Sequence, residues 1–134
     1  MGMKLFLDAC AIIYLIEAGG EQGWKTRQLV NQHLSDGKKL FVSRLSVLEC
    51  RILPLRNQDR ALTERYVQFF ALPEVEIIEL TAAVVEQATV LRVHYPLRTP
   101  DALQAACALV VEADKFVTGD RQFSCVPVLK VELI

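Results

Sequence analysis

Short runs rich in β-branched and aromatic residues alternate with longer amphipathic stretches along this 134-residue chain. The runs predict strands at residues 4–8, 40–43, 76–79, 115–118 and 128–131. Between them, the pattern predicts helices near residues 10–18, 23–36, 46–53 and 82–94. Apolar residues spaced at i, i+4, i+7 and i+8 mark two more helices, around Tyr66 and around Cys107. Strands that alternate with helices predict an α/β fold with a mostly parallel sheet.

Composition narrows the class of protein. No linker, repeat or low-complexity segment interrupts residues 1–134, so we predict a single domain. The net charge of −1 means that any contact with nucleic acid must rely on local charge or on a metal. No apolar run approaches the ~20 residues of a membrane helix, and we expect no membrane association. Four scattered cysteines and no secretion signal favour reduced thiols and a cytoplasmic location.

Four acidic residues stand close to the ends of predicted strands or the starts of predicted helices. Asp8 interrupts the apolar run LFLDACAIIYLI, and Glu49 follows the second strand in SRLSVLEC. Asp101 opens a helix in RTPDALQAA, and Asp120 follows the fourth strand in VTGDRQF. Right-handed crossovers place the carboxyl ends of parallel strands on one edge, where open α/β sheets bind ligands. Because Asp101 precedes a strand, its place beside the others is a packing inference.

Each acid also has a purely structural interpretation. Asp8 and Asp120 are suited to cap helices, because a carboxylate there accepts hydrogen bonds from free backbone N–H groups. Glu49 completes the capping-box sequence SVLE. Asp101 follows Thr99, the predicted N-cap of its helix, and Pro100 at the first helical position, where the helix dipole favours an acid.

If the four carboxylates converge, they repel one another, and burial adds a further cost. No lysine or histidine adjoins Asp8, Glu49 or Asp101 in the sequence. A hard divalent cation, Mg²⁺ or Mn²⁺, prefers oxygen ligands and offsets such charge. This pattern predicts metal-assisted phosphodiester hydrolysis. The chain has no G-x-S-x-G motif and no Walker A loop, which disfavours a serine hydrolase and a P-loop nucleotide site.

Taken in order, these motifs resemble a PIN domain, and in particular a VapC-type toxin, the ribonuclease of a bacterial toxin–antitoxin pair. The motifs that carry the resemblance are LFLDACAIIYLI, SRLSVLE, TPDALQAACAL and VTGDRQF. The resemblance implies a three-layer α/β/α sandwich with a five-stranded parallel sheet. It also implies Mg²⁺- or Mn²⁺-dependent endoribonuclease activity on single-stranded RNA, a homodimer, and a small antitoxin that neutralises the enzyme.

The resemblance further implies roles for individual residues. The catalytic and metal-binding residues would be Asp8, Glu49, Asp101 and Asp120, with Asp8 and Asp101 as the main ligands. Thr118 resembles the family's hydroxyl that orders the site by hydrogen bonding.

Basic residues near the motifs are candidates for substrate contacts. Arg121 and Arg44 are predicted to bind phosphate, because a guanidinium group matches phosphate geometry. For Arg121, an exposed charge or a salt bridge to one of the acids is an equal alternative.

The chain departs from the family pattern at three positions. Ala9 and Cys10 replace a hydroxyl residue and an asparagine, and Gly119 stands where asparagine is frequent. These changes remove polar groups that commonly tune a metal site. The alternative is therefore a catalytically weak PIN-like module that binds RNA or a protein partner.

A DNA nuclease of related fold is disfavoured, because so short a chain has little room for insertions that would clamp a duplex.

Overall fold

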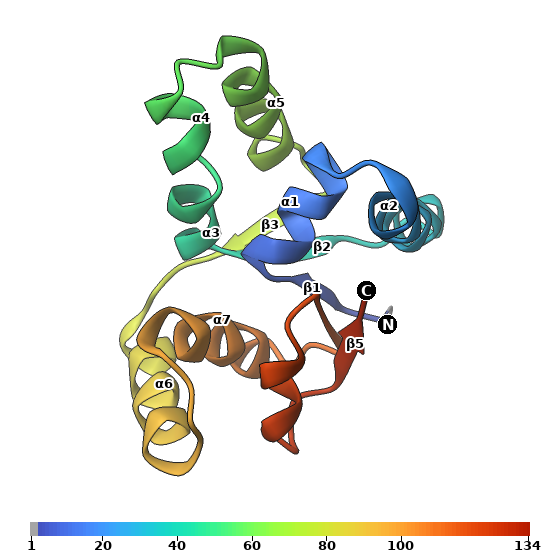
Figure 1. Ribbon diagram of the computed structural model, residues 1–134. Coiled ribbons are helices and arrows are strands. Elements are labelled where there is room, and N and C mark those ends of the chain that lie inside the picture. Colours follow the sequence, from blue (N-terminus) through green and yellow to red (C-terminus); the bar gives the residue numbers. More distant parts are fainter. Residues whose placement is uncertain (1–2) are drawn as a thin grey trace.

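A computed structural model describes residues 3–134 and shows three layers, helices on both faces of a central sheet (Figure 1). The sheet has five parallel strands in the order β3-β2-β1-β4-β5. The strands are β1 (Leu5–Leu7), β2 (Leu40–Ser43), β3 (Val75–Ile78), β4 (Lys115–Thr118) and β5 (Val131–Leu133). The predicted α/β/α fold is therefore confirmed.

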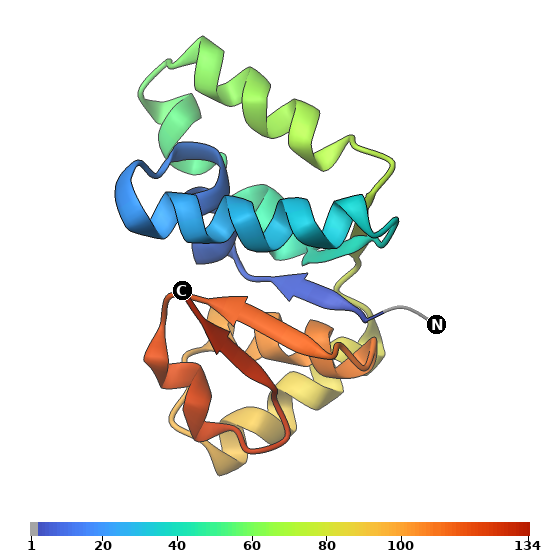
Figure 2. The same cartoon turned by 90° about the vertical axis from the view of Figure 1, so that its right-hand side faces the viewer.

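The helices divide between the two faces of the sheet, as Figures 1 and 2 both show. One side carries α1 (Ala9–Glu17), α2 (Gly20–Ser35), α3 (Arg44–Glu49), α4 (Ile52–Arg56) and α5 (Arg60–Phe70). The other carries α6 (Ala82–His94), α7 (Thr99–Val110) and the 3₁₀ helix η1 (Arg121–Cys125).

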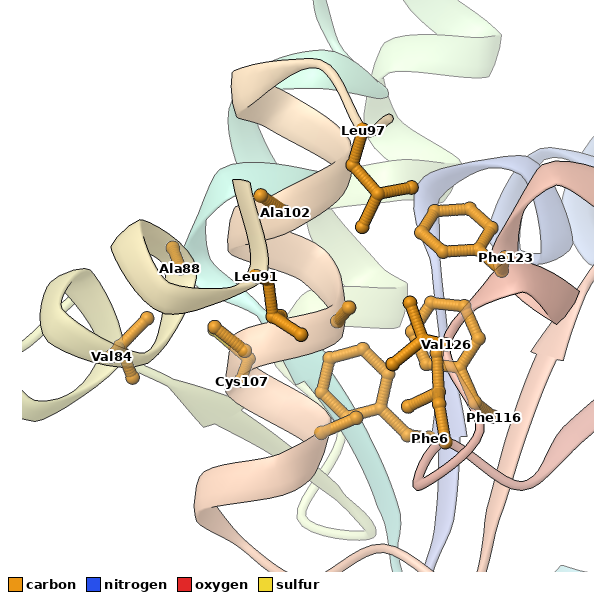
Figure 3. Close-up of a cluster of buried hydrophobic side chains, with 14 residues drawn as sticks. Phe6, Val84, Ala88, Leu91, Leu97, Ala102, Cys107, Phe116, Phe123 and Val126 are labelled. Atoms are coloured by element: carbon orange, nitrogen blue, oxygen red, sulfur yellow. The ribbon is translucent and has the colours of Figure 1, made fainter. Parts of the chain in front are cut away.

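The alternation of side chains along β1 explains why both faces are covered. Leu5 and Leu7 point into the core beneath α1, α2 and α5, whereas Phe6 points to the opposite face. There Phe6 stacks on Phe116 at a centroid distance of 5.5 Å, and Phe116 contacts Phe123 of η1 at 4.7 Å. Figure 3 shows this second core, which α6 and α7 close. A central strand buried on both faces reads as a continuous apolar run, as in the sequence.

Two predicted elements were wrong in their bounds. The strand predicted at residues 128–131 forms later, at β5, because Val131 pairs with Phe116 and Leu133 with Thr118 of β4. The helix predicted at residues 46–53 is two short helices, α3 and α4. Ser43 causes the earlier start of α3, because its side chain accepts a hydrogen bond from the Leu45 backbone N–H at 3.0 Å.

Within residues 3–134, no helix combines the length and the apolarity that crossing a bilayer requires. All four cysteines of this part of the chain are free thiols.

Candidate active site

Asp8 lies directly after the central strand β1 and is only 4% exposed. Its Oδ1 accepts a hydrogen bond of 2.8 Å from the Ala11 backbone N–H, so Asp8 caps α1 as the sequence suggested. Its Oδ2 accepts a second bond of 2.6 Å from the hydroxyl of Thr118, at the end of the neighbouring strand β4. Asp8 is thus both a helix cap and a rigidly oriented carboxylate at the carboxyl edge of the sheet.

Thr118 also forms a hydrogen bond with Asp120, another of the predicted acids. Its Oγ1 accepts a hydrogen bond of 3.0 Å from the backbone N–H of Asp120, while it donates to Asp8. The Asp120 carboxylate caps η1 by accepting from the Gln122 backbone N–H at 2.9 Å. One hydroxyl therefore connects two of the predicted acids, and the contact expected of Thr118 is present.

Electrostatics place the carboxylates of Asp101 and Asp120 in the same neighbourhood as Asp8. Burial raises the pKa of Asp8 from 3.8 to about 6, although its hydrogen bonds to Thr118 and Ala11 oppose this shift. The negative charges of Asp120 and Asp101 raise the pKa further. A buried carboxyl whose pKa is raised to about 6, with two other acids near it, is typical of a functional site.

Asp101 enters this neighbourhood from the first turn of α7. The predicted Thr99 cap was wrong, because α7 starts one residue earlier and Arg98 occupies the N-cap position without a side-chain cap. The Arg98 Nε lies 3.4 Å from Asp101 Oδ2, with Arg98 79% and Asp101 17% exposed. Arg98 precedes Asp101 by three positions, a spacing that makes two side chains neighbours on a helix.

Glu49 is the last residue of α3 and does not form the capping box suggested by SVLE. Its Oε1 accepts a hydrogen bond of 3.1 Å from Nε2 of Gln104, which lies on α7. The same Nε2 donates to the Ser46 hydroxyl at 2.9 Å. Gln104 is a residue that sequence reasoning missed. The available signal was its position one turn after Asp101, in a helix otherwise rich in buried alanine.

The candidate ligands are carboxylate oxygens, which a hard cation prefers. The Asp8 carboxylate is already oriented by its hydrogen bonds with Ala11 and Thr118. The buried Oε1 of Gln104 lacks a hydrogen-bond partner among the described residues. Across residues 3–134, however, no three histidine, cysteine or acidic side chains form a complete metal-binding group. The arrangement therefore suits Mg²⁺ or Mn²⁺, which are commonly held by one or two carboxylates and several waters.

The two arginines predicted to bind substrate differ in their surroundings. Arg44 is engaged by Glu79, with Nε–Oε1 at 2.9 Å and Nη2–Oε2 at 2.5 Å. Arg121, at the start of η1, is exposed and forms no salt bridge within residues 3–134. Arg121 is therefore the better placed of the two to contact an anion.

Two of the three departures from the family pattern, Cys10 and Gly119, are neighbours in space. A Cβ atom on Gly119 would lie 2.7 Å from Cε2 and 2.9 Å from the hydroxyl of Tyr14, and 3.1 Å from Sγ of Cys10. Tyr14 and Cys10 thus occupy the space that a side chain at position 119 would need. Cys10 and Tyr14 are four residues apart and so share one face of α1. This spacing does not by itself indicate that Gly119 lies against that face.

Comparison with known proteins agrees with this fold. The family model described as "PIN domain" matches residues 5–129. No curated protein sequence matches the chain. The fold resembles VapBC2 from Rickettsia felis, solved bound to a DNA fragment from their promoter, with a TM-score of 0.77 and 20% identity over 98% of this chain and 99% of that one.

Two further solved structures are similar. VapC20 from Mycobacterium tuberculosis, described as a toxin that cleaves the sarcin–ricin loop, has a TM-score of 0.74 and 19% identity over 90% of this chain and 93% of that one. A toxin–antitoxin complex from Klebsiella pneumoniae has a TM-score of 0.73 and 19% identity, over 93% and 94% of the respective chains.

Proposed function

Because this chain belongs to the PIN-domain family, we propose that it is a metal-dependent endoribonuclease that cleaves single-stranded RNA and acts as the toxin of a toxin–antitoxin pair. The observation that supports this best is the buried Asp8. It accepts a hydrogen bond from Thr118, and its burial, together with the charges of Asp120 and Asp101, raises its pKa to about 6. A carboxylate kept in such surroundings costs stability unless a cation binds there.

In this proposal, Asp8 and Asp101 are the main ligands of Mg²⁺ or Mn²⁺, and Glu49 and Asp120 complete the site directly or through water. The cation, when bound, polarises a phosphoryl oxygen and lowers the pKa of a water molecule. Thr118 keeps the Asp8 carboxylate oriented, because its hydroxyl donates to Oδ2. Arg121 binds a phosphate of the RNA through its free guanidinium group.

Cleavage of a labelled single-stranded RNA in Mn²⁺, Mg²⁺ or EDTA tests the activity. Asp101→Asn should remove metal-dependent cleavage, because it weakens a main ligand while keeping the size of the side chain. Asp36→Asn is the matched control, since Asp36 is an exposed residue at the end of α2. Equal cleavage by wild type and D101N would show that the activity comes from a contaminant and would refute the assignment.

The antitoxin partner is proposed from a second observation. Four large apolar residues on or beside α3 and α4 are exposed to solvent: Leu48, Ile52, Leu53 and Leu55. Exposed large apolar side chains that are close in the sequence are compatible with a protein interface. The similar structures include toxin–antitoxin complexes, which favours an antitoxin segment as the occupant.

With the antitoxin co-expressed, Leu53→Asp should abolish co-purification of the complex and leave Mn²⁺ binding unchanged. Val93→Asp, at an exposed valine on α6, is the control and should keep the complex. Loss of the complex in both variants, or in neither, would exclude the surface of α3 and α4.

Sedimentation of the isolated chain tests the proposed homodimer. We also propose a cytoplasmic location, because all four cysteines of the described residues are free thiols.

The alternative is a PIN-like module that binds RNA or a protein without cleaving RNA. Its support is the contact between Tyr14, Cys10 and Gly119, which fills the space of a polar side chain with a phenol ring and a thiol. Mn²⁺ titration separates the two proposals, because a module that only binds RNA does not need the cation. RNA binding that is unaffected by both Mn²⁺ and D101N would favour the module.

A further inference from the structure

Gln104 is a polar residue on the buried face of α7. This face otherwise consists of small apolar residues: Ala102, Ala105, Ala106, Cys107 and Ala108. Gln104 is 3% exposed, and nothing in the helix itself requires an amide at this position. Its side chain must therefore serve the contact between α7 and the neighbouring α3.

The Gln104 amide uses its donor fully. Nε2 donates to the Ser46 hydroxyl at 2.9 Å and to Glu49 Oε1 at 3.1 Å, so both hydrogens of the amide have acceptors on α3. These two acceptors fix the direction of the amide plane. Glu49 is at the last position of its helix, where few backbone contacts restrain a side chain, and Gln104 is its only hydrogen-bond donor within residues 3–134.

The acceptor of the same amide is unused. Oε1 is buried and finds no partner within the described part of the chain. A buried carbonyl without a donor is unfavourable, and an apolar residue of similar volume would avoid that cost. An arrangement that costs stability yet orients an acidic residue is expected where the side chain serves a site.

The location of Gln104 identifies that site. Asp101 lies three residues earlier on α7, and residues three apart are neighbours on a helix surface. Gln104 thus connects the helix that carries Asp101 to the acid at the end of α3. The Oε2 atom of Glu49 keeps no protein partner among the described residues, which leaves it available to a ligand.

We propose that Gln104 is a positioning residue of the acidic site: through Nε2 it orients the Glu49 carboxylate toward the divalent cation that Asp8 and Asp101 bind. This inference rests on the proposed function. Gln104 touches neither the cation nor the RNA, and it acts through Glu49. Gln104 therefore affects the affinity for the cation more than the stability of the fold.

Mn²⁺ binding, followed by the electron paramagnetic resonance signal of the free ion, tests the inference without relying on activity. Gln104→Met removes the amide and keeps the volume. It should weaken Mn²⁺ binding by about tenfold or more, the usual effect of removing a group that orients a ligand. Its midpoint of thermal unfolding should change little, because the loss of the hydrogen bond to the buried Ser46 hydroxyl is offset by the removal of the unpartnered Oε1. Gln68→Met is the matched control, since Gln68 also donates to a glutamate, Glu64 on α5.

A double-mutant cycle tests whether Gln104 acts through Glu49. In the Glu49→Gln background, Gln104→Met should cause no further loss of Mn²⁺ affinity. Gln104→Asn replaces Met if that variant does not fold, since its amide is one methylene too short to reach Glu49. Unchanged Mn²⁺ binding in a folded Gln104 variant would overturn the inference, as would additive losses in the cycle. Absence of Mn²⁺ binding and of RNA cleavage in the wild type would instead refute the proposed function and this inference with it.

Discussion

Thr118 donates a hydrogen bond of 2.6 Å to Asp8, and so joins the ends of two adjacent strands, β4 and β1, at the acidic site. The same oxygen accepts from the Asp120 backbone N–H at 3.0 Å.

Thr118→Val should therefore destabilise the protein at pH 7.5 by about 1.5–3 kcal/mol, the usual value of a hydrogen bond to a charged group. At pH 4.5 the loss should be smaller, because Asp8 is then neutral. Urea unfolding at both pH values measures the difference. Thr89→Val is the control, since the exposed Thr89 donates to the Val85 carbonyl within its own helix, α6. An equal loss at both pH values would show that the charge of Asp8 is not involved.

The raised pKa of Asp8 predicts how stability depends on pH. Its value changes from 3.8 in the unfolded chain to about 6 in the folded protein, so the folded state binds this proton more tightly. The resulting stabilisation is complete below about pH 4 and is lost as the pH rises through 6. At pH 7.5, without divalent cations, Asp8→Asn should therefore be more stable than wild type, by at most about 3 kcal/mol.

Denaturant unfolding of wild type and Asp8→Asn in EDTA, from pH 4 to pH 8, checks this prediction. The two curves should converge at the acidic end and separate above pH 6. The same variant should lose cleavage of RNA. A D8N variant that is less stable at pH 7.5, or that keeps full activity, would contradict the role given to Asp8.

Protons and divalent cations should compete for Asp8, because both neutralise the same carboxylate. Saturating Mn²⁺ should thus raise the midpoint of thermal unfolding more at pH 7.5 than at pH 5, since a ligand stabilises according to its affinity for the folded state. Differential scanning calorimetry with Mn²⁺ or EDTA at each pH measures the shift. Asp8→Asn should show little stabilisation at either pH. A shift in the wild type that does not depend on pH would place the cation elsewhere.

Gly119 should not tolerate even one methyl group. Gly119→Ala would bring its Cβ to 2.7 Å from the Tyr14 ring, which should cost about 1–3 kcal/mol of stability. Tyr14→Ala in the same chain should restore part of this loss, because it removes the closest atoms. Gly19→Ala is the control, since a Cβ there meets nothing within 4 Å. Chemical denaturation of the four variants measures the coupling, and purely additive effects would show that the two residues do not interact.

The sequence by itself determined the class of fold. An apolar run with β-branched and aromatic residues has to be buried on both faces, which requires helices on each side of a parallel sheet. Asp8 and Asp120 were also identified correctly as caps, because capping depends on backbone geometry within a few residues. The bounds of β5, however, depended on pairing with β4, which lies outside any local pattern.

Only the tertiary structure decided how the acidic residues relate to one another. Glu49 and Gln104 are 55 residues apart in sequence, and Asp8 and Thr118 are 110 apart. Such contacts arise from the crossing of helices and the order of strands, and side-chain packing selects them. Residue type and spacing therefore predicted which groups could bind a cation. The packing of α3 and α7 and the pairing of β1 with β4 decided which neighbours orient them and at what cost in free energy.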